Sequence, residues 1–231
     1  MRILAMDCAT SACSVALWCD GAIADHSYTP MSRGQAEALA PMIQEVLGAA
    51  DVAASALDLL VVSVGPGAFT GLRIGLAMAR GMALALSVPC LGLSTTEVIA
   101  AGVDDSAWQG GALLVALDSK RSDIYVQMFL KPGEADSQPQ AMEPDKLAEW
   151  LTDAPGPVGV VGDASSLALA ALADTNIDAF AVVAPGVPDA RVMAALAARR
   201  WSLGDTVALP GPLYLRPPDA KVPMGGGQLR P

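Results

Sequence analysis

A glycine-rich segment offers the clearest chemistry in the sequence. Residues 65–71 read Gly-Pro-Gly-Ala-Phe-Thr-Gly, and they follow the apolar run 58–64. Glycines let a backbone approach its neighbours closely, and a helix N-terminus presents unpaired N–H groups to an anion. A P-loop also needs a lysine, and a dinucleotide fingerprint needs a different glycine spacing. The segment therefore fits either a phosphate cradle or a tight turn that packs a helix on a sheet.

Two aspartates at predicted strand ends could also belong either to a phosphate site or to simple turns. Asp7 ends an apolar strand and is followed by Thr10, and Asp118 ends a similar strand in the second half. Carboxylates in such turns hold a metal–phosphate in nucleotide-binding folds, but they also form simple Asx turns. If the phosphate interpretation holds, we expect a vestigial phosphate site made of Asp7, Thr10, Gly65, Gly67 and Asp118.

Nucleophilic and metal chemistry have few candidates. His26 is the only histidine, so a Ser-His-Asp triad would depend on it, and no G-x-S-x-G elbow is present. A histidine-rich metal site is excluded by count, and the cysteines form no C-x-x-C pair, so we expect no metal and no cofactor. We expect reduced thiols, typical of a cytoplasmic protein, at Cys8, Cys13, Cys19 and Cys90.

Composition and charge narrow the class of protein. Hydrophobic residues make up 53% of the 231 residues, enough for a sizeable core. With 24 acidic and 14 basic residues the net charge is −10, so strong binding of nucleic acid by this chain alone is not expected. The longest uncharged stretch, 81–96, contains a proline, and the N-terminal apolar run is short. We therefore expect neither a membrane span nor a signal peptide.

Hydrophobic patterning predicts alternating strands and helices in both halves of the chain. An Asp-Gly pair at 20–21 predicts a tight hairpin turn. In the first half we expect strands at 2–7, 12–18, 22–29, 58–64 and 90–93, and helices at 35–50, 72–87 and 95–102. In the second half we expect strands at 112–118, 123–130, 157–162 and 179–183, a loop at 131–145, and helices at 145–152, 164–173 and 189–203.

The order of these elements indicates a duplicated α/β fold. Each half begins with a hairpin whose first strand ends in aspartate and continues into β/α alternation. We expect one domain at 1–104 and a second at 105–216, with the last helix able to return to the first domain. Residues 217–231 contain three consecutive glycines and four prolines, which predicts a flexible tail.

The helix after the glycine-rich segment is unusually apolar. Between residues 72 and 86 its only charges are Arg73 and Arg80, and small residues recur every four positions. A helix that is apolar nearly all round must be buried on two sides, and we favour a partner protein over the domain's own core for one of them. With helix 35–47 beside it, we expect an interface of Leu39, Met42, Ile43, Val46, Leu72, Arg73, Gly75, Leu76, Ala79, Arg80 and Ala83.

Four segments together resemble one known family. MDCATSACSVALW at 6–18, SVGPGAFTGLRIGLAMARGMAL at 63–84, LGLST at 91–95 and PLYLR at 212–216 are similar to the TsaB (YeaZ) family. These bacterial proteins are needed for the threonylcarbamoyladenosine modification of tRNA. The resemblance implies an actin-like, Hsp70-like (ASKHA) ATPase fold of two related domains, each with a mixed sheet and flanking helices.

The resemblance also implies a non-catalytic role. Members of the family are expected to dimerise with and activate the catalytic subunit TsaD, together with the ATPase TsaE, or to form homodimers when TsaD is absent. Contact with tRNA is expected only through the complex. TsaD carries an H-x-x-x-H metal site, and the corresponding positions here are Gln35 and Leu39, which are unsuited to hold iron or zinc.

Two other functions remain open on the sequence alone. An autonomous nucleotide-binding ATPase or small-molecule kinase would use Asp7, Asp118 and the 65–71 loop. A peptidase would require His26 as its base.

Overall fold

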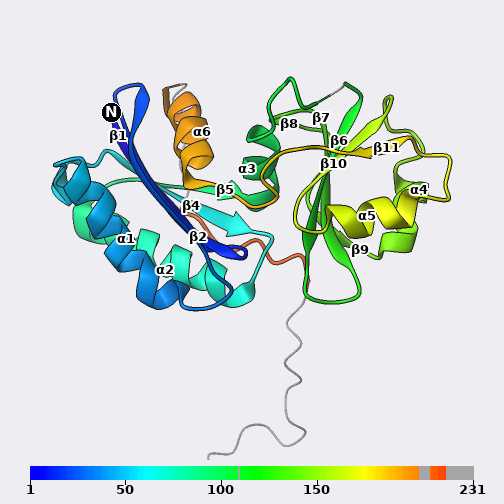
Figure 1. Cartoon of the computed structure of the whole chain (residues 1–231). Helices are drawn as coiled ribbons and strands as arrows, with labels where there is room; N and C mark the ends of the chain where they lie inside the picture. Colours follow the sequence, from blue (N-terminus) through cyan, green and yellow to red (C-terminus); the bar gives the residue numbers. More distant parts are fainter. Residues whose placement is uncertain (109, 203–208, 217–231) are drawn as a thin grey trace, which may run out of the picture.

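The computed structural model describes residues 1–108, 110–202 and 209–216, and the tail expected at 217–231 lies outside this part. Two β-sheets lie next to each other, and each has helices on both faces (Figure 1). The chain builds the first sheet, crosses to the second, and then returns helix α6 (Ala190–Ser202) to the first.

The first sheet has the order β3-β2-β1-β4-β5. Its first three strands are antiparallel, while β1, β4 and β5 run parallel. Asp20 and Gly21 both have positive φ, as the Asp-Gly turn predicted. The strands are β1 (Arg2–Asp7), β2 (Ala12–Cys19), β3 (Ala22–Pro30), β4 (Leu59–Gly65) and β5 (Cys90–Ser94).

The second sheet repeats this arrangement. Its order is β11-β10-β6-β7-β8, so the first strand of the half is again central, with its hairpin partner on one side and parallel strands on the other. The repeated order confirms the predicted duplication. Its strands are β6 (Ala112–Asp118), β7 (Ile124–Lys131), β8 (Glu134–Ala135), β9 (Gln140–Met142), β10 (Val158–Val161) and β11 (Ala179–Ala181).

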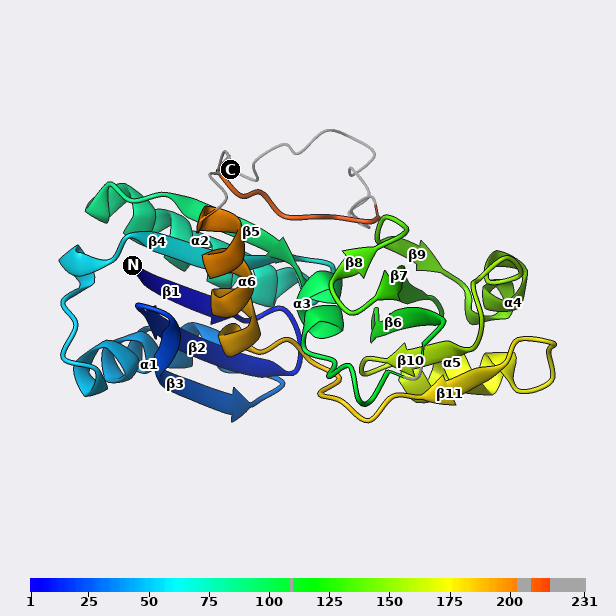
Figure 2. The same cartoon turned by 90° about the horizontal axis from the view of Figure 1, so that it is seen from above.

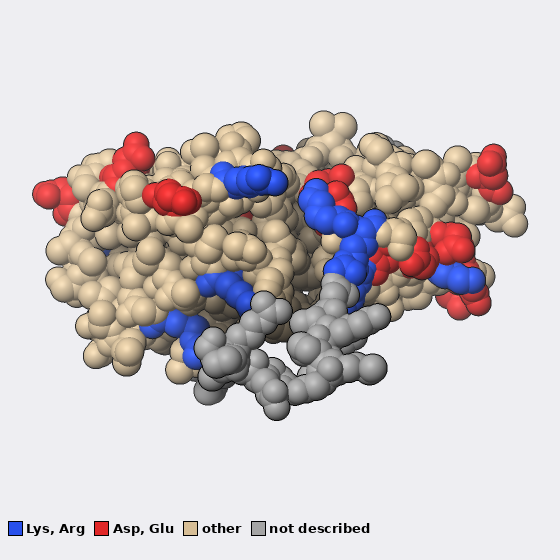
Figure 3. All heavy atoms as spheres, turned by 90° about the horizontal axis from the view of Figure 1, so that it is seen from below, with Lys and Arg blue, Asp and Glu red and all other residues tan. Residues whose placement is uncertain are grey.

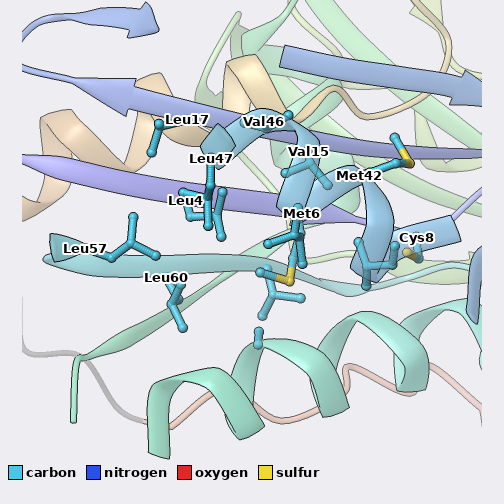
Figure 4. Close-up of a cluster of buried hydrophobic side chains, with 14 of the residues drawn as sticks. Leu4, Met6, Cys8, Val15, Leu17, Met42, Val46, Leu47, Leu57 and Leu60 are labelled. Carbon is cyan, nitrogen blue, oxygen red and sulfur yellow. The ribbon is translucent and has the colours of Figure 1, made fainter. Parts of the chain in front are cut away.

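Helices α1 (Gln35–Ala49) and α2 (Phe69–Leu86) lie side by side on one face of the first sheet. Their apolar stripes pack with side chains of β1, β2 and β4, among them Leu4, Met6 and Leu60 (Figure 4). The large buried side chains of this layer come from alternate positions of the strands, as expected for a sheet covered on both faces.

Two of the remaining helices, α3 and α6, pack against the sheet of the other half. Helix α6 packs on the other face of the first sheet, whereas Ile99 and Ala100 of α3 (Thr95–Ala101) join the core of the second sheet (Figure 2). The opposite face of the second sheet is covered by α4 (Leu147–Trp150) and α5 (Ser165–Leu172). We propose that the boundary between the domains falls near residue 104, with α3 and α6 packing across it.

Among the described residues, α2 is the helix long and apolar enough to cross a membrane by length and composition. It connects β4 to β5, which are adjacent parallel strands of one sheet. Such a crossover requires the helix to lie on the sheet. A third of α2 is buried there, further residues are half-buried against the same core, and most of its exposed residues are apolar or small.

Candidate functional site

A cavity of about 1090 Å³ lies between the two halves of the molecule. It is bounded by the β1–β2 turn, the first turns of α1 and α2, the end of β6 and residues 213–216. Basic side chains gather around the middle of this face (Figure 3). The charged residues that line the cavity are Arg33, Glu37, Arg73, Asp118, Lys120, Arg121, Asp163 and Arg216.

The glycine-rich segment is packed against the β1–β2 turn. A Cβ atom on Gly67 would overlap the carbonyl oxygen of Ala9, and a Cβ on Gly71 would overlap that of Cys8. The Ala68 N–H donates to the Ala9 carbonyl oxygen at 2.7 Å. These glycines are therefore required by close backbone packing, which supports the tight-turn interpretation over a phosphate cradle.

Asp7 is sealed away from the cavity. Its side chain is fully buried and accepts hydrogen bonds at Oδ1 from the Ser63 hydroxyl and, at 3.2 Å, from the Ala9 N–H. Burial raises the pKa of this carboxyl to about 7, against its usual 3.8. Because Asp7 points into the protein, it cannot hold a metal–phosphate in the cavity as this turn stands.

The expected phosphate site is consequently divided. Thr10, Gly67 and Asp118 line the cavity, whereas Asp7 and Gly65 do not. Gly65 is buried, with its Cα facing the carbonyl oxygen of Leu213. The sequence could not reveal this division, because it depends on how the turn folds over Asp7.

Asp118 at the equivalent place in the second half is engaged with basic and backbone groups. Its Oδ2 lies 2.7 Å from Lys120 Nζ, and its own N–H donates to Asp163 Oδ1 at 2.8 Å. Burial would raise the pKa of Asp118, but the hydrogen bonds from Lys120 outweigh it and hold this pKa below its usual range. Asp118 therefore stays ionised and is neutralised locally.

His26 has a structural position. It lies on the edge strand β3, and its Nε2 is 3.2 Å from Oδ1 of Asp189, just before α6. Burial lowers the pKa of His26 despite the nearby carboxylate. No serine is hydrogen-bonded to it among the described side chains, and no group of three or more metal-ligating residues occurs in the described part. The pair joins β3 to the start of α6.

Gln35 and Leu39, the two positions that the family resemblance aligns with metal ligands, have structural roles in this chain. Leu39 is fully buried in the core under α1. Gln35 is nearly buried, and its side-chain amide donates to the carbonyl oxygen of Met31 at 3.3 Å. Leucine has no donor atom, and the Gln35 amide is used to anchor the start of the helix.

The predicted interface residues need correction. Only Arg73 and Arg80 among them are exposed, and the others pack in the protein's own core. A helix between parallel strands places its most apolar stripe on the sheet, so the strongest hydrophobic periodicity marks the core side. The buried residues are Leu39, Met42, Ile43, Val46, Leu72, Gly75, Leu76, Ala79 and Ala83.

The opposite sides of the same helices form an exposed surface, which we call the outer α1–α2 face. On α2, positions 73, 77, 80 and 84 follow one stripe, and Leu84 at its end is 84% exposed. In Figure 3 the surface on this side of the molecule is mainly uncharged, with separate acidic and basic side chains around it. The exposed apolar or small residues of this face are Ala36, Pro41, Ala77, Gly81, Leu84 and Ala85, and the half-buried Ala40, Ile74 and Met78 lie beside them, with Glu37 and Glu45 as the exposed acidic residues of α1.

Phe69 and Tyr214 border this face and were not expected as site residues. The Arg73 guanidinium lies 3.6 Å from the centroid of the Phe69 ring, and its Nε donates to the Tyr214 hydroxyl at 3.0 Å. Phe69 stood in the glycine-rich segment without a predicted role. Tyr214 lies in the segment 212–216, and nothing local in the sequence indicates where that segment packs.

A known protein family and several curated relatives that match this chain are named for the threonylcarbamoyladenosine modification of tRNA. A family model described as "TsaD: tRNA N6-adenosine threonylcarbamoyltransferase" matches residues 29–168. The tRNA threonylcarbamoyladenosine biosynthesis protein TsaB of Escherichia coli K12 is 32% identical over 228 residues, covering 94% of this chain and 95% of that protein. TsaB of Bacillus subtilis 168 is 26% identical over 151 residues, 65% of each chain.

Solved structures show the same fold. YeaZ from Pseudomonas aeruginosa is 29% identical, with a TM-score of 0.77 over 93% of this chain and 99% of that one. Another structure from that organism, at 28% identity, a TM-score of 0.77 and the same coverage, is described as similar to peptidase YeaZ. Component A of the Acidaminococcus fermentans (R)-2-hydroxyglutaryl-CoA dehydratase, 11% identical over 87% of this chain and 99% of that one, has a TM-score of 0.51 and shares the fold alone. Together with the repeated sheet order, these matches confirm the predicted actin-like, Hsp70-like fold.

Proposed function

The chain belongs to the TsaB (YeaZ) family, and from this membership we propose that it is a non-catalytic subunit of the tRNA N6-threonylcarbamoyladenosine machinery. In this proposal the chain dimerises with the catalytic subunit TsaD and activates it, with TsaE joining the pair. The proposal places the protein in the cytoplasm, where tRNA is modified, and gives it contact with tRNA only through the complex.

The outer α1–α2 face is the observation that carries this proposal. Soluble monomers seldom expose a broad apolar area, and such areas mark contacts with other proteins. Alanine and glycine at the surface let a partner helix approach closely, and the exposed side chain of Leu84 offers an anchor for a pocket. Arg73 and Arg80 on the same side supply charges that fix register.

The chemistry of the described residues supports a non-catalytic role. Leu39 and Gln35 are built into the fold, and His26 is paired with Asp189 at the start of α6. The glycine-rich segment is used to pack α2 on the β1–β2 turn. An autonomous ATPase or kinase has less support, because the glycine-rich segment serves packing. Asp7 would also have to leave its buried position to reach a nucleotide.

Mixing the purified chain with its cognate TsaD tests the proposal. Size-exclusion chromatography with light scattering is expected to give one species of summed mass, and TsaD is expected to modify tRNA with TsaE only when this chain is present. Separate peaks together with unchanged modification would contradict the proposal. Calorimetric titration of the chain alone with ATP and Mg²⁺ is expected to give no binding heat, and Mg²⁺-dependent binding would favour the ATPase or kinase alternative.

The outer α1–α2 face also leads us to expect self-association of the chain when TsaD is absent. An apolar face that is left uncovered tends to pair with a second copy of itself. We therefore expect concentration-dependent homodimers of the isolated chain, and TsaD should displace the second copy. The two interfaces then compete, which sedimentation velocity with increasing amounts of TsaD would show as replacement of homodimer by heterodimer.

A further inference from the structure

Residues 210–216 form an extended segment that touches both domains, and we call it the strap. On the first domain, the Leu213 N–H donates to the Val64 carbonyl oxygen at the end of β4, at 2.7 Å. Pro210 lies against Gly92 of β5, where a Cβ would come within 2.9 Å of the proline ring. The strap thus follows the ends of two parallel strands at the cavity (Figure 2).

Tyr214 connects the strap to the start of α2. Its hydroxyl accepts a hydrogen bond from Arg73 Nε at 3.0 Å, and its ring lies 5.4 Å from the Phe69 ring. The Arg73 guanidinium lies over the Phe69 ring, so the three side chains form one cluster. Phe69 is 51% exposed and Tyr214 is 45% exposed, so the cluster is open to a protein that docks on the outer α1–α2 face.

Arg216, two residues further on, is anchored to the second domain. Its guanidinium forms an ion pair with Asp123, donates to the Ser119 hydroxyl oxygen at 3.3 Å, and lies 5.5 Å from the Tyr125 ring. Ser119 in turn donates to the backbone carbonyl oxygen of Asp123 at 2.6 Å. Both side chains of the ion pair are partly buried, so water and salt screen it less than an exposed surface pair.

The two anchors are too close in sequence to move independently. Adjacent residues in an extended chain are separated by about 3.3–3.6 Å, so Tyr214 and Arg216 are held within about 7 Å along the strap. We call the cavity between the two domains the interdomain cleft, and its opening must release either the contacts of Arg216 or those of Leu213 and Tyr214. We propose that the strap holds the interdomain cleft closed and transmits docking at Phe69 and Arg73 to the β6–β7 turn of the second domain.

The first half of this inference can be tested on the chain alone. In Arg216→Ala, backbone amides of residues 119–125 are expected to exchange hydrogen about fivefold faster than in the wild type. Spin labels at Ser55→Cys and Leu167→Cys, in a Cys19→Ser background, are expected to report a longer and broader interdomain distance. Arg216→Lys should give values between those of the wild type and Arg216→Ala. A lysine keeps the positive charge but lacks the planar guanidinium that donates several hydrogen bonds at once.

Lys131→Ala serves as the matched control, because it removes a surface ion pair with Glu134 that lies within one domain. It is expected to leave both readouts unchanged. Identical distance distributions for the wild type and Arg216→Ala would contradict the proposed role of the strap, and so would an equal effect of Lys131→Ala. A thermal melt shows whether each variant is folded. If Arg216→Ala is not folded, hydrogen exchange at 119–125 and the interdomain distance are measured in Arg216→Lys instead.

The second half rests on the proposed function and has its own readout. Binding of TsaD is expected to slow exchange in α2 and also at 119–125 in the wild type. In Arg216→Ala, protection of α2 should remain while protection at 119–125 is lost. Protection at 119–125 that survives in Arg216→Ala would contradict transmission through the strap. Absence of protection at α2 in both proteins would instead contradict the docking proposal and leave the closed-cleft measurements standing on their own result.

Discussion

The Cα of Gly71 lies directly against the carbonyl oxygen of Cys8, so closely that a Cβ there would overlap the oxygen. This contact seats the first turn of α2 on the β1–β2 turn. It explains the glycine-rich segment by packing alone, and it fixes the direction in which α2 leaves the sheet. The position of the outer α1–α2 face therefore depends on this contact.

Replacing Gly71 with alanine should destabilise the protein. The neighbouring atom is a backbone oxygen, which cannot move aside as a flexible side chain could, so we expect a loss of about 1–3 kcal/mol in the free energy of unfolding. Gly81→Ala is the matched control on the same helix, because a Cβ there has nothing within 4 Å. It should stabilise the protein by about 0.5–1 kcal/mol. Urea unfolding of both variants measures the difference, and equal effects would contradict the packing role of Gly71.

Much of the fold was predictable because its signals are local. The Asp20-Gly21 turn and the continuous apolar run of β4 are read from a few neighbouring residues. In the structure Ser94 accepts a hydrogen bond from the Glu97 N–H at 3.2 Å and so caps the start of α3. Every predicted helix and strand of the first half is present within a few residues of its expected bounds.

The errors arose where the answer depends on distant parts of the chain. Residues 131–145 were expected to be a loop, but β8 and β9 occur there as short edge strands that pair with β7. Their proline-rich, polar sequence carries no strand signal of its own. The interface residues were misassigned because hydrophobic periodicity identifies the stripe of a helix that is buried, without saying whether its own sheet or a partner buries it.

Leu39 provides a test of that correction. Because its side chain is fully buried among core residues of α1 and the sheet, Leu39→Ala should lower the free energy of unfolding by about 2–5 kcal/mol. The folded fraction should still bind TsaD with the affinity of the wild type. Urea unfolding and calorimetric titration with TsaD measure the two quantities. A variant with wild-type stability and weakened binding of TsaD would show that Leu39 belongs to the interface and not to the core.

Asp7 should make stability depend on pH. Its pKa is about 7 in the folded protein and 3.8 as its usual value, so the folded state holds a proton that the unfolded state has lost between these pH values. Stability should therefore fall as pH rises from about 4 to about 7, by an amount on the order of a few kcal/mol. Urea unfolding between pH 5 and 8 measures this slope.

Asp7→Asn should flatten that slope, because asparagine resembles the protonated acid and does not titrate. The exposed Asp145→Asn is the control and should keep the wild-type slope. A wild-type slope that persists in Asp7→Asn would show that another group causes the pH dependence.

The central claim is that the outer α1–α2 face binds TsaD, and one pair of variants tests it most directly. Leu84 is 84% exposed on α2, and Leu167 is 48% exposed on α5 of the second domain. Either leucine can be replaced by glutamate without burying a charge in the folded monomer. Calorimetric titration with TsaD should show binding weakened by about 30-fold or more for Leu84→Glu, the loss typical of a central interface residue, and wild-type affinity for Leu167→Glu. Wild-type affinity for Leu84→Glu, or equal weakening by both variants, would contradict the account.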